Sequence, residues 1–394
     1  MTSAAVYLDY NATAPVRPSV AEAVSRALDS PGNPSSVHAF GRSARRLLDE
    51  SRETVAGLAG APADGVIFTS GGTEANALAI TGWGRRRVLV SAIEHPSVLK
   101  AGVVEIIPVE PKGTIDLAAL ERFLSASREP ALVAVMLANN ETGVVQPVAE
   151  VARLAKAHGA IVHCDAVQAL GKIDVDLQTL GVDSLAVSAH KLGGPTGSGA
   201  LLLADPDAAF SPLIEGGGQE RRKRAGTENL PGIAGFAAAV RAVQAETGEA
   251  RRLAALRDAL EHGARQRAPA LSVLGHDAER LPNTSCVAVP GVAAQTLLMG
   301  LDLAGVAVSA GSACSSGKLA PSHVLVAMGE AALAASAIRI SLGWASKESD
   351  VERFLDAFGA LAMRLGVTAG NGTGDNERID DQEYRRALLP EMQG

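Results

Sequence analysis

Residues 161–191 read IVHCDAVQALGKIDVDLQTLGVDSLAVSAHK, and this stretch predicts the class of fold. It contains two short apolar runs, 160–167 and 184–190, separated by a more polar segment. Continuous apolar runs of this length are typical of strands that are covered on both faces of a parallel sheet. Asp165 lies near the end of the first run and Lys191 directly follows the second. We therefore expect buried strands that bring an acid and an amine to one edge of the sheet.

The same alternation continues along the first two-thirds of the chain. Further strands are expected at 66–70, 87–92, 103–109, 131–139 and 199–204. Helices are expected between them at 73–82, 117–125 and 147–158. This order of elements predicts an α/β domain with a mostly parallel, seven-stranded sheet.

A different pattern follows a long amphipathic stretch at 232–268. Strands are expected at 282–289, 306–309 and 337–341, and helices at 293–301, 321–328 and 347–365. This pattern predicts a smaller α+β domain. We expect a large domain at 15–248, a small domain formed by 1–14 and 249–369, and a polar, glycine-rich flexible tail at 370–394.

Charge and composition exclude several classes of protein. The chain has 394 residues, a net charge of −7 and a pI near 5.7, which gives no electrostatic footprint for nucleic acid or an anionic membrane. We find neither a secretory signal nor an apolar run near the ~18 residues that span a bilayer. Three cysteines without a C-x-x-C motif favour a reducing cytoplasm over a disulfide scaffold.

Polar residues follow several of the expected strands, and each has an ordinary explanation beside a functional one. The segment 70–74, SGGTE, is a ready phosphate cradle at a helix start, although a plain helix cap explains it too. Asp165 is either a structural hydrogen-bond acceptor or a cofactor ligand. Lys191 is either leaving the core or is a partly desolvated amine suited to covalent catalysis.

The three cysteines differ in their surroundings. Cys164 and Cys286 lie inside apolar runs, where a free cysteine packs as a small, inert hydrophobe. Cys314 lies in SAGSACSSGK, which offers no apolar partners, so we interpret it as an exposed, reactive thiol. The sequence contains no complete P-loop, no H-E-x-x-H motif and no Cys/His set suited to zinc.

Taken together, these stretches resemble one family. The chain is similar to the cysteine desulfurases of the nitrogen-fixation and iron–sulfur-assembly type, which are class-V aminotransferase-like, fold-type-I pyridoxal-phosphate (PLP) enzymes. The similar stretches run from residue 7 to about 344. They include VIFTSGGTEANALAI, HCDAVQALGKI, SLAVSAHKLGGP, RAGTENLPGI and SAGSACSSGK.

The resemblance implies four residues around the cofactor ring. Lys191 matches the lysine that binds PLP covalently, and Asp165 the carboxylate that pairs with the pyridinium nitrogen. Gln168 matches the donor to the ring hydroxyl, and His95 the imidazole that stacks on the ring and moves protons.

The remaining matches imply which residues bind the cofactor phosphate and the substrate carboxylate, and which cysteine takes the sulfur. The residues expected to bind the phosphate are Gly72, Thr73, Ser188 and His190. Thr227 matches a phosphate ligand that is donated by the partner subunit of a homodimer. Asn140 and Arg339 match the pair that fixes the substrate carboxylate, and Cys314 the persulfide-forming cysteine on a long loop.

The implied reaction removes sulfur from L-cysteine, releases L-alanine and leaves a persulfide on Cys314 for a protein acceptor such as an iron–sulfur scaffold. Two alternatives stay open. One is another PLP reaction on the same fold, such as transamination or selenocysteine lysis. The other is a catalytically silent sulfur-relay or scaffold protein, which would need neither Lys191 nor Asp165. The tail beyond Ala369 has no recognisable similarity, so the sequence does not identify the acceptor.

Overall fold

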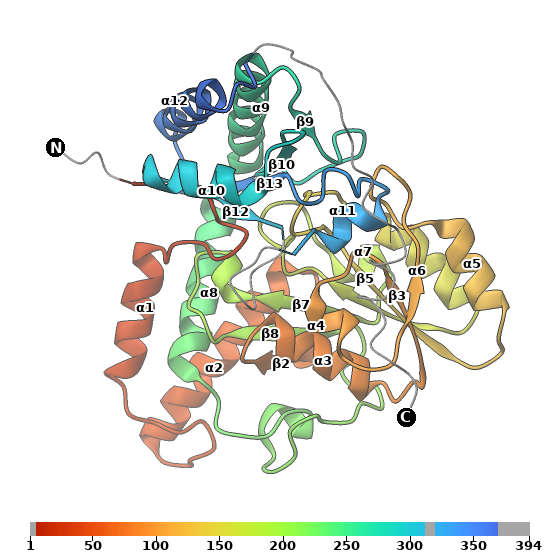
Figure 1. The fold of residues 1–394 in the computed structure, drawn as a ribbon. Helices are drawn as coiled ribbons and strands as arrows, with labels where there is room; N and C mark the ends of the chain where they lie inside the picture. The colour runs from red at the N-terminus through yellow and green to blue at the C-terminus, as the bar shows by residue number, and fades with distance from the viewer. Residues whose placement is uncertain (1–4, 312–319, 369–394) are drawn as a thin grey trace, which may run out of the picture.

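The computed structural model describes residues 5–311 and 320–368 and is drawn in Figure 1. A large sheet with its helices forms the lower part of the view, and a smaller sheet with α9, α10 and α12 lies above it. In the part of the chain that the structure describes, no helix is long and apolar enough to cross a membrane.

The large sheet has seven strands in the order β2-β8-β7-β6-β5-β3-β4, which confirms the predicted α/β class. Its strands are β2 (Val66–Thr69), β3 (Arg87–Ser91), β4 (Glu105–Ile107), β5 (Ala131–Met136), β6 (Ile161–Asp165), β7 (Ser184–Ser188) and β8 (Gly199–Leu203). Only β8 runs antiparallel to its two neighbours, and the pairs among β7, β6, β5, β3 and β4 are parallel. Because β2 and β7 are both antiparallel to β8, β2 ends at the same edge as the parallel strands.

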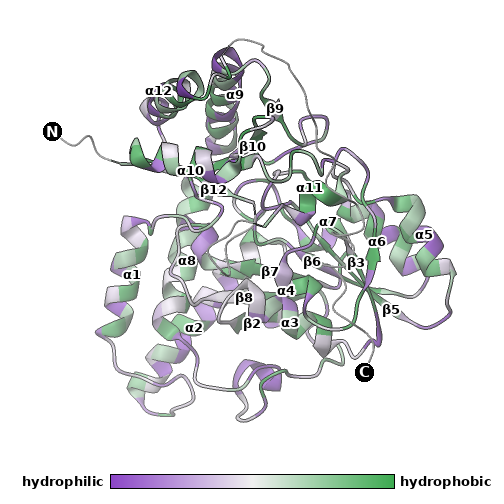
Figure 2. Ribbon diagram, viewed as in Figure 1, coloured by the Kyte–Doolittle hydropathy of each residue, from purple (hydrophilic) through white to green (hydrophobic). Residues whose placement is uncertain are grey.

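Helices cover both faces of this sheet, which explains why its strands are apolar throughout. Their bounds are α1 (Pro18–Leu28), α2 (Ala39–Leu58), α3 (Gly72–Gly82), α4 (Pro96–Leu99), α5 (Leu117–Ser125), α6 (Val148–Ala157), α7 (Leu177–Leu180) and α8 (Leu230–Ala245). Short 3₁₀ turns are η1 (Ala63–Gly65), η2 (Ala189–Lys191) and η3 (Gln219–Arg222). The apolar sides of α3 and α4 pack on one face of the sheet, and the other helices share a larger core on the opposite face. Figure 2 shows hydrophobic residues along the central strands and polar residues on outward turns of the helices.

The smaller unit is built on the antiparallel sheet β12-β13-β10-β9. Its strands are β9 (Ser272–Val273), β10 (Thr284–Ala288), β12 (Ser309–Ala310) and β13 (Ala337–Ser341), and its helices are α9 (Glu249–Arg267), α10 (Ala294–Leu303), α11 (His323–Ala327) and α12 (Glu348–Arg364). The N-terminal strand β1 (Val6–Tyr7) joins this unit by parallel pairing with β11 (Val306–Ala307). Leu8 accordingly packs in the same core cluster as Phe354 and Phe358.

Two expected elements differ from the structure in detail. The amphipathic stretch 232–268 forms two helices, α8 and α9, which are separated at residues 246–248, where the φ of +80° at Gly248 favours glycine. The strand expected at 306–309 is divided into β11 and β12, which belong to different sheets. The domain boundaries at 15–248 and 249–369 stay a prediction, and the expected tail at 370–394 lies outside the described residues.

Candidate active site

A cavity of about 220 Å³ opens at the carboxyl edge of the large sheet. The predicted site residues that line it are Gly72, Thr73, His95, Asn140, Asp165, Gln168, Ser188, His190 and Lys191. They lie at or after the ends of β2, β3, β5, β6 and β7, so the structure brings them together at one edge of the sheet, as the strand-end argument expects. A larger cavity, of about 910 Å³, lies elsewhere on the protein.

The acidic group of this site is held by a directed chain of hydrogen bonds. Asp165, with 6% of its surface exposed, accepts from the Val167 backbone N–H at 2.9 Å and from Asn76 Nδ2 at 2.7 Å. Asn76 Oδ1 in turn lies 3.0 Å from His163 Nε2, and His163 Nδ1 lies 3.0 Å from Ser184 Oγ. Complete burial lowers the pKa of His163 to about 3, so its ring is neutral. An amide oxygen only accepts, so Nε2 carries the ring proton and every donor in the chain points towards Asp165.

Lys191 supplies the amine. It ends η2, directly after β7, and its Nζ donates to the backbone oxygens of Asn11 and Ala12 at 2.5 and 2.8 Å. Burial lowers the pKa of Lys191 to about 8, and the positive charge of Arg339 acts in the same direction. A much larger fraction of this amine is therefore neutral, and so nucleophilic, than in a solvated lysine.

His95 borders the cavity and caps the short helix α4. Its Nδ1 accepts the Ser97 backbone N–H at 3.1 Å and lies 2.8 Å from Ser97 Oγ. Desolvation and the nearby charge of Lys191 lower the pKa of His95, although the Asp165 carboxylate opposes them. In the neutral ring an Nδ1 that accepts leaves the proton on Nε2, so His95 is set to donate from that nitrogen.

The opposite end of the cavity fits a phosphate. Gly71 and Gly72 open α3, and no side chain caps its first N–H groups, so these donors remain for an anion. The buried Ser188 Oγ has no hydrogen-bond partner among the described residues. A Cβ on Gly72 would come within 2.7 Å of Val167 Cγ2, so the cradle needs glycine there. Burial lowers the pKa of His190 to about 4, so its ring is neutral and can donate to a phosphate oxygen.

PLP matches this arrangement group by group. A helix start and a hydroxyl suit its phosphate, a carboxylate suits its ring nitrogen, and a partly neutral lysine suits its aldehyde. Gln168 lies in the cavity with its Nε2 donating to the Asn11 backbone oxygen at 2.9 Å. The residues present therefore fit the cofactor that the resemblance implies.

Three predicted residues stand apart from the cavity wall. Arg339 lies behind it, where it donates to Asn140 O at 3.0 Å and to Asp9 Oδ1 at 2.7 Å. Its Nε is buried without a partner among the described residues, so this guanidinium has spare hydrogen-bonding capacity. Thr227 is exposed and does not line the cavity. Cys314 lies outside the described residues.

Sequence reasoning missed Asn76, Asn11 and Lys172. Asn76 had a usable signal, because it interrupts the apolar helix segment ANALAI one turn after Gly72. Asn11 joins the two sheets through hydrogen bonds to residues more than 150 positions away, which no local pattern reveals. Cys164 and Cys286 are buried as predicted, and burial raises the pKa of both thiols, that of Cys286 to about 12.

Comparisons with known proteins agree with this site. Residues 6–354 match the family model for aminotransferase class-V. A cysteine desulfurase from Cereibacter sphaeroides is 44% identical over 377 residues, covering 91% of this chain and 96% of that protein. The cysteine desulfurase IscS of Dictyoglomus turgidum is 40% identical, covering 91% of this chain and 95% of its own. The crystal structure of a NifS-like protein from Rickettsia africae is similar with a TM-score of 0.85 and 35% identity, over 91% of this chain and 99% of that one.

Proposed function

The chain belongs to the class-V aminotransferase family, among its cysteine desulfurases, and from that premise we propose that it takes sulfur from L-cysteine and holds it as a persulfide on Cys314. The observation that carries the proposal is that Lys191, Asp165 and His95 line one cavity beside the N-terminus of α3, which no side chain caps. A scaffold protein would need none of these groups together, so the silent alternative is disfavoured.

PLP, when bound, supplies an electron sink for negative charge that develops at the substrate Cα. Asp165 keeps a proton on the ring nitrogen, since two N–H donors hold its carboxylate in place. Lys191 removes the Cα proton, for which its lowered pKa suits it. His95 gives or takes a proton at Nε2 on the open side of the cavity.

Substrate binding falls to the turn that follows β5. Asn140 lines the cavity, and Arg339 bonds to its backbone oxygen, so both can be directed to the carboxylate of L-cysteine. In the sulfur-transfer step the Cys314 thiolate attacks the substrate sulfur. The new S–S bond takes the place of the Cβ–S bond, and the carbon fragment keeps that electron pair and is protonated to become alanine.

The chain on either side of residues 312–319 supports this role for Cys314. Ser322 Oγ donates to Glu141 Oε2 at 2.5 Å. Gly311 packs against the same carboxylate, because a Cβ there would lie 2.0 Å from Glu141 Oε2. Glu141 is the neighbour of Asn140, so both ends of the cysteine-bearing segment begin beside the proposed substrate site.

We further propose a homodimer in which Thr227 reaches the phosphate of the neighbouring subunit. The segment before it is anchored, because the buried Glu220 accepts from Arg52 Nη1 and Nη2 at 2.8 Å and from the Phe68 backbone N–H at 2.9 Å. Exposed apolar side chains at Phe40, Leu213 and Ile214 offer surface for a second copy. Equilibrium sedimentation of a fully active monomer would contradict this part of the proposal.

The sulfur acceptor is proposed to be a cytoplasmic protein, of the kind that assembles iron–sulfur clusters. This proposal rests on the family alone. A pull-down with the persulfide form of the enzyme, followed by mass spectrometry, identifies the acceptor.

The proposed function is tested by Cys314→Ser, which nearly preserves the side-chain volume and removes the nucleophile. The variant should keep the visible absorption of bound PLP and lose sulfide and alanine release by about a hundredfold or more. The matched control is Cys286→Ser, which changes a buried thiol and should affect stability more than turnover. If Cys314→Ser turns over L-cysteine at nearly the wild-type rate, the persulfide step is wrong and a β-eliminating lyase is the better interpretation.

A further inference from the structure

Lys172 is a half-buried lysine for which the proposed reaction has no use. Its Nζ donates to Gln168 Oε1 at 2.9 Å and to Asn11 Oδ1 at 2.8 Å. Within residues 5–311 and 320–368, no carboxylate forms an ion pair with it. Burial holds the pKa of Lys172 well below its ordinary value, and the charges of Lys191 and Arg339 add to this effect. Such a position is unfavourable for an ammonium group, so it calls for an explanation.

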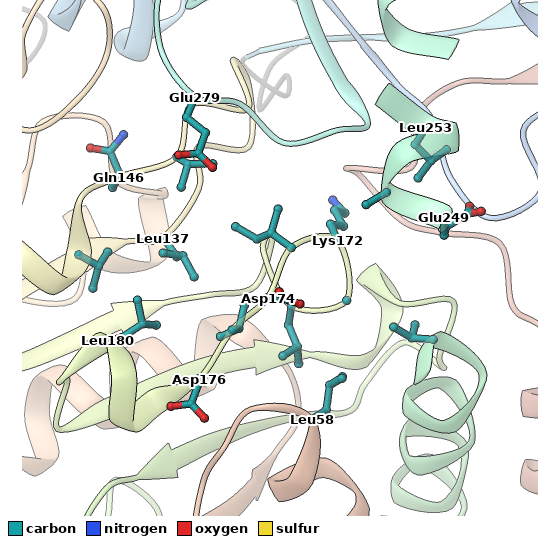
Figure 3. A pocket seen from close by; sticks show the side chains of 18 of the residues that line it. Leu58, Leu137, Gln146, Lys172, Asp174, Asp176, Leu180, Glu249, Leu253 and Glu279 are labelled. Carbon is teal, nitrogen blue, oxygen red and sulfur yellow. The ribbon is translucent and has the colours of Figure 1, made fainter. Parts of the chain in front are cut away.

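Several carboxylates that could have formed an ion pair with Lys172 line the same cavity. Lys172 lies on the wall of a cavity of about 910 Å³, whose lining also contains Asp174, Asp176, Glu249 and Glu279. Figure 3 shows Lys172 on the same loop as Asp174, with Glu249 and Glu279 on neighbouring elements. The amine is bonded to two amide oxygens instead of these acids. The contact with Gln168 and Asn11 is therefore the feature to explain.

That contact helps to determine which way the Gln168 amide faces. Lys172 Nζ donates to Gln168 Oε1, so the amide oxygen faces the lysine. The amide nitrogen is then turned away from Lys172, and one of its N–H bonds donates to the Asn11 backbone oxygen at 2.9 Å. The second N–H is left for a group inside the cavity that Gln168 lines.

Lys172 also donates a hydrogen bond to Asn11, whose backbone oxygen accepts from both Gln168 and Lys191. Asn11 Oδ1 accepts from Lys172 and from Asn283 Nδ2 at 3.1 Å, which fixes its own amide. Its backbone oxygen accepts from Lys191 Nζ and from Gln168 Nε2. One ammonium group thus sets two amides at the junction of the small and large sheets.

We propose that Lys172 is a positioning residue of the cofactor site, which holds the Gln168 amide so that its nitrogen, and not its oxygen, faces the ring hydroxyl of PLP. This inference rests on the proposed role of Gln168 in the desulfurase site. Without Lys172 only the bond to the Asn11 backbone oxygen holds this orientation, so the amide turns over more readily, and an oxygen facing the ring oxygen would repel it where a nitrogen would donate.

The test measures how tightly the holoenzyme keeps PLP, by dialysis against graded PLP concentrations and the visible absorption that remains. Lys172→Met keeps the length of the side chain without a donor, and we expect about a tenfold higher dissociation constant, equal to about 1.4 kcal/mol. Lys172→Arg keeps a group that only donates, and should stay within about twofold of wild type. The control is Lys100→Met, an exposed lysine outside the site, which should not change PLP retention.

A double-mutant cycle with Gln168→Ala separates positioning from a general structural effect. Lys172→Met should weaken PLP binding in the wild-type background and have little further effect once Gln168 is alanine. An equal loss in both backgrounds would overturn the proposal, as would Lys172→Met or Gln168→Ala binding PLP like wild type, or Lys172→Arg losing it like Lys172→Met. If Lys172→Met does not fold, as judged by thermal melting, the PLP dissociation constants of Lys172→Arg and Gln168→Ala still test the proposal. Alanine release by the wild-type enzyme tests the desulfurase proposal separately.

Discussion

The lowered pKa of Lys191 has a consequence for stability that can be measured. In the unfolded chain this lysine titrates near its usual value of 10.5, whereas in the folded, cofactor-free protein its pKa is about 8. A pKa difference of this size means that the free energy of folding is about 3 kcal/mol less favourable with Lys191 protonated than with Lys191 neutral. At pH 7 the neutral fraction rises from roughly 0.03% to roughly 10%, and this is the form that attacks an aldehyde.

The sign of the effect follows from counting protons. Between pH 8 and 10.5 the unfolded chain holds a proton on Lys191 that the folded protein has lost, so stability rises with pH through this window. Below pH 8 both states are protonated, and the full cost of burying the ammonium group remains. Lys191→Met removes that cost, so the cofactor-free variant should gain more stability over wild type at pH 7 than at pH 10.5.

The assay is urea unfolding of the cofactor-free wild type and of Lys191→Met at both pH values. The mutation also removes two hydrogen bonds, to Asn11 O and Ala12 O, but this loss enters at both pH values and cancels in the difference. We expect a difference of about 1–3 kcal/mol between the two mutational effects. A difference near zero, or of opposite sign, would refute the reasoning, and Lys112→Met on the surface controls for general pH effects.

Three further predictions follow from the site. Asn76→Leu leaves Asp165 and His163 without their shared partner, so PLP retention should fall at least tenfold; unchanged retention in equilibrium dialysis would show that the hydrogen-bond chain is dispensable. Gly72→Val should abolish PLP absorption by filling the phosphate cradle, and a yellow variant would place the phosphate elsewhere. Ending the chain after Gly370 should preserve PLP absorption and alanine release, because α12 and Val367, the last residues of the described chain that pack in the core, are retained; loss of folding would show that the tail packs on the body.

Much of the fold could be predicted because its signals are local. The runs at 66–70, 131–139 and 184–190 are largely apolar, as expected for strands covered on both faces, and each contains a strand of the large sheet. Asp165 and Lys191 could be placed because strand ends in such a sheet share one edge. The division of 232–268 at Gly248 was less visible, since an isolated glycine within a helical pattern is often tolerated.

The residues that sequence reasoning missed are those whose partners are remote. Lys172 shows this most clearly, because its sequence context, GKID, suggests a surface lysine beside an aspartate. Its real partners are Gln168, four residues earlier, and Asn11, which belongs to the N-terminal segment that pairs with β11. The site is therefore formed both by the carboxyl ends of the strands and by the N-terminal segment that contains Asn11. The strand ends alone do not form it.

The charges of the site explain why these remote contacts are needed. Besides burial, the charges of Lys191 and Arg339 lower the pKa of Lys172, and the charge of Arg339 lowers the pKa of Lys191. Of these three cations, only Arg339 has a direct carboxylate partner among the described residues, in Asp9. Like charges gathered in a partly buried space are unfavourable unless anions offset them. The groups that would do so are the phosphate and ring hydroxyl of PLP and the carboxylate of an amino acid. The three cationic side chains at the carboxyl edge are therefore better explained by ligands that bind there than by the stability of the protein without them.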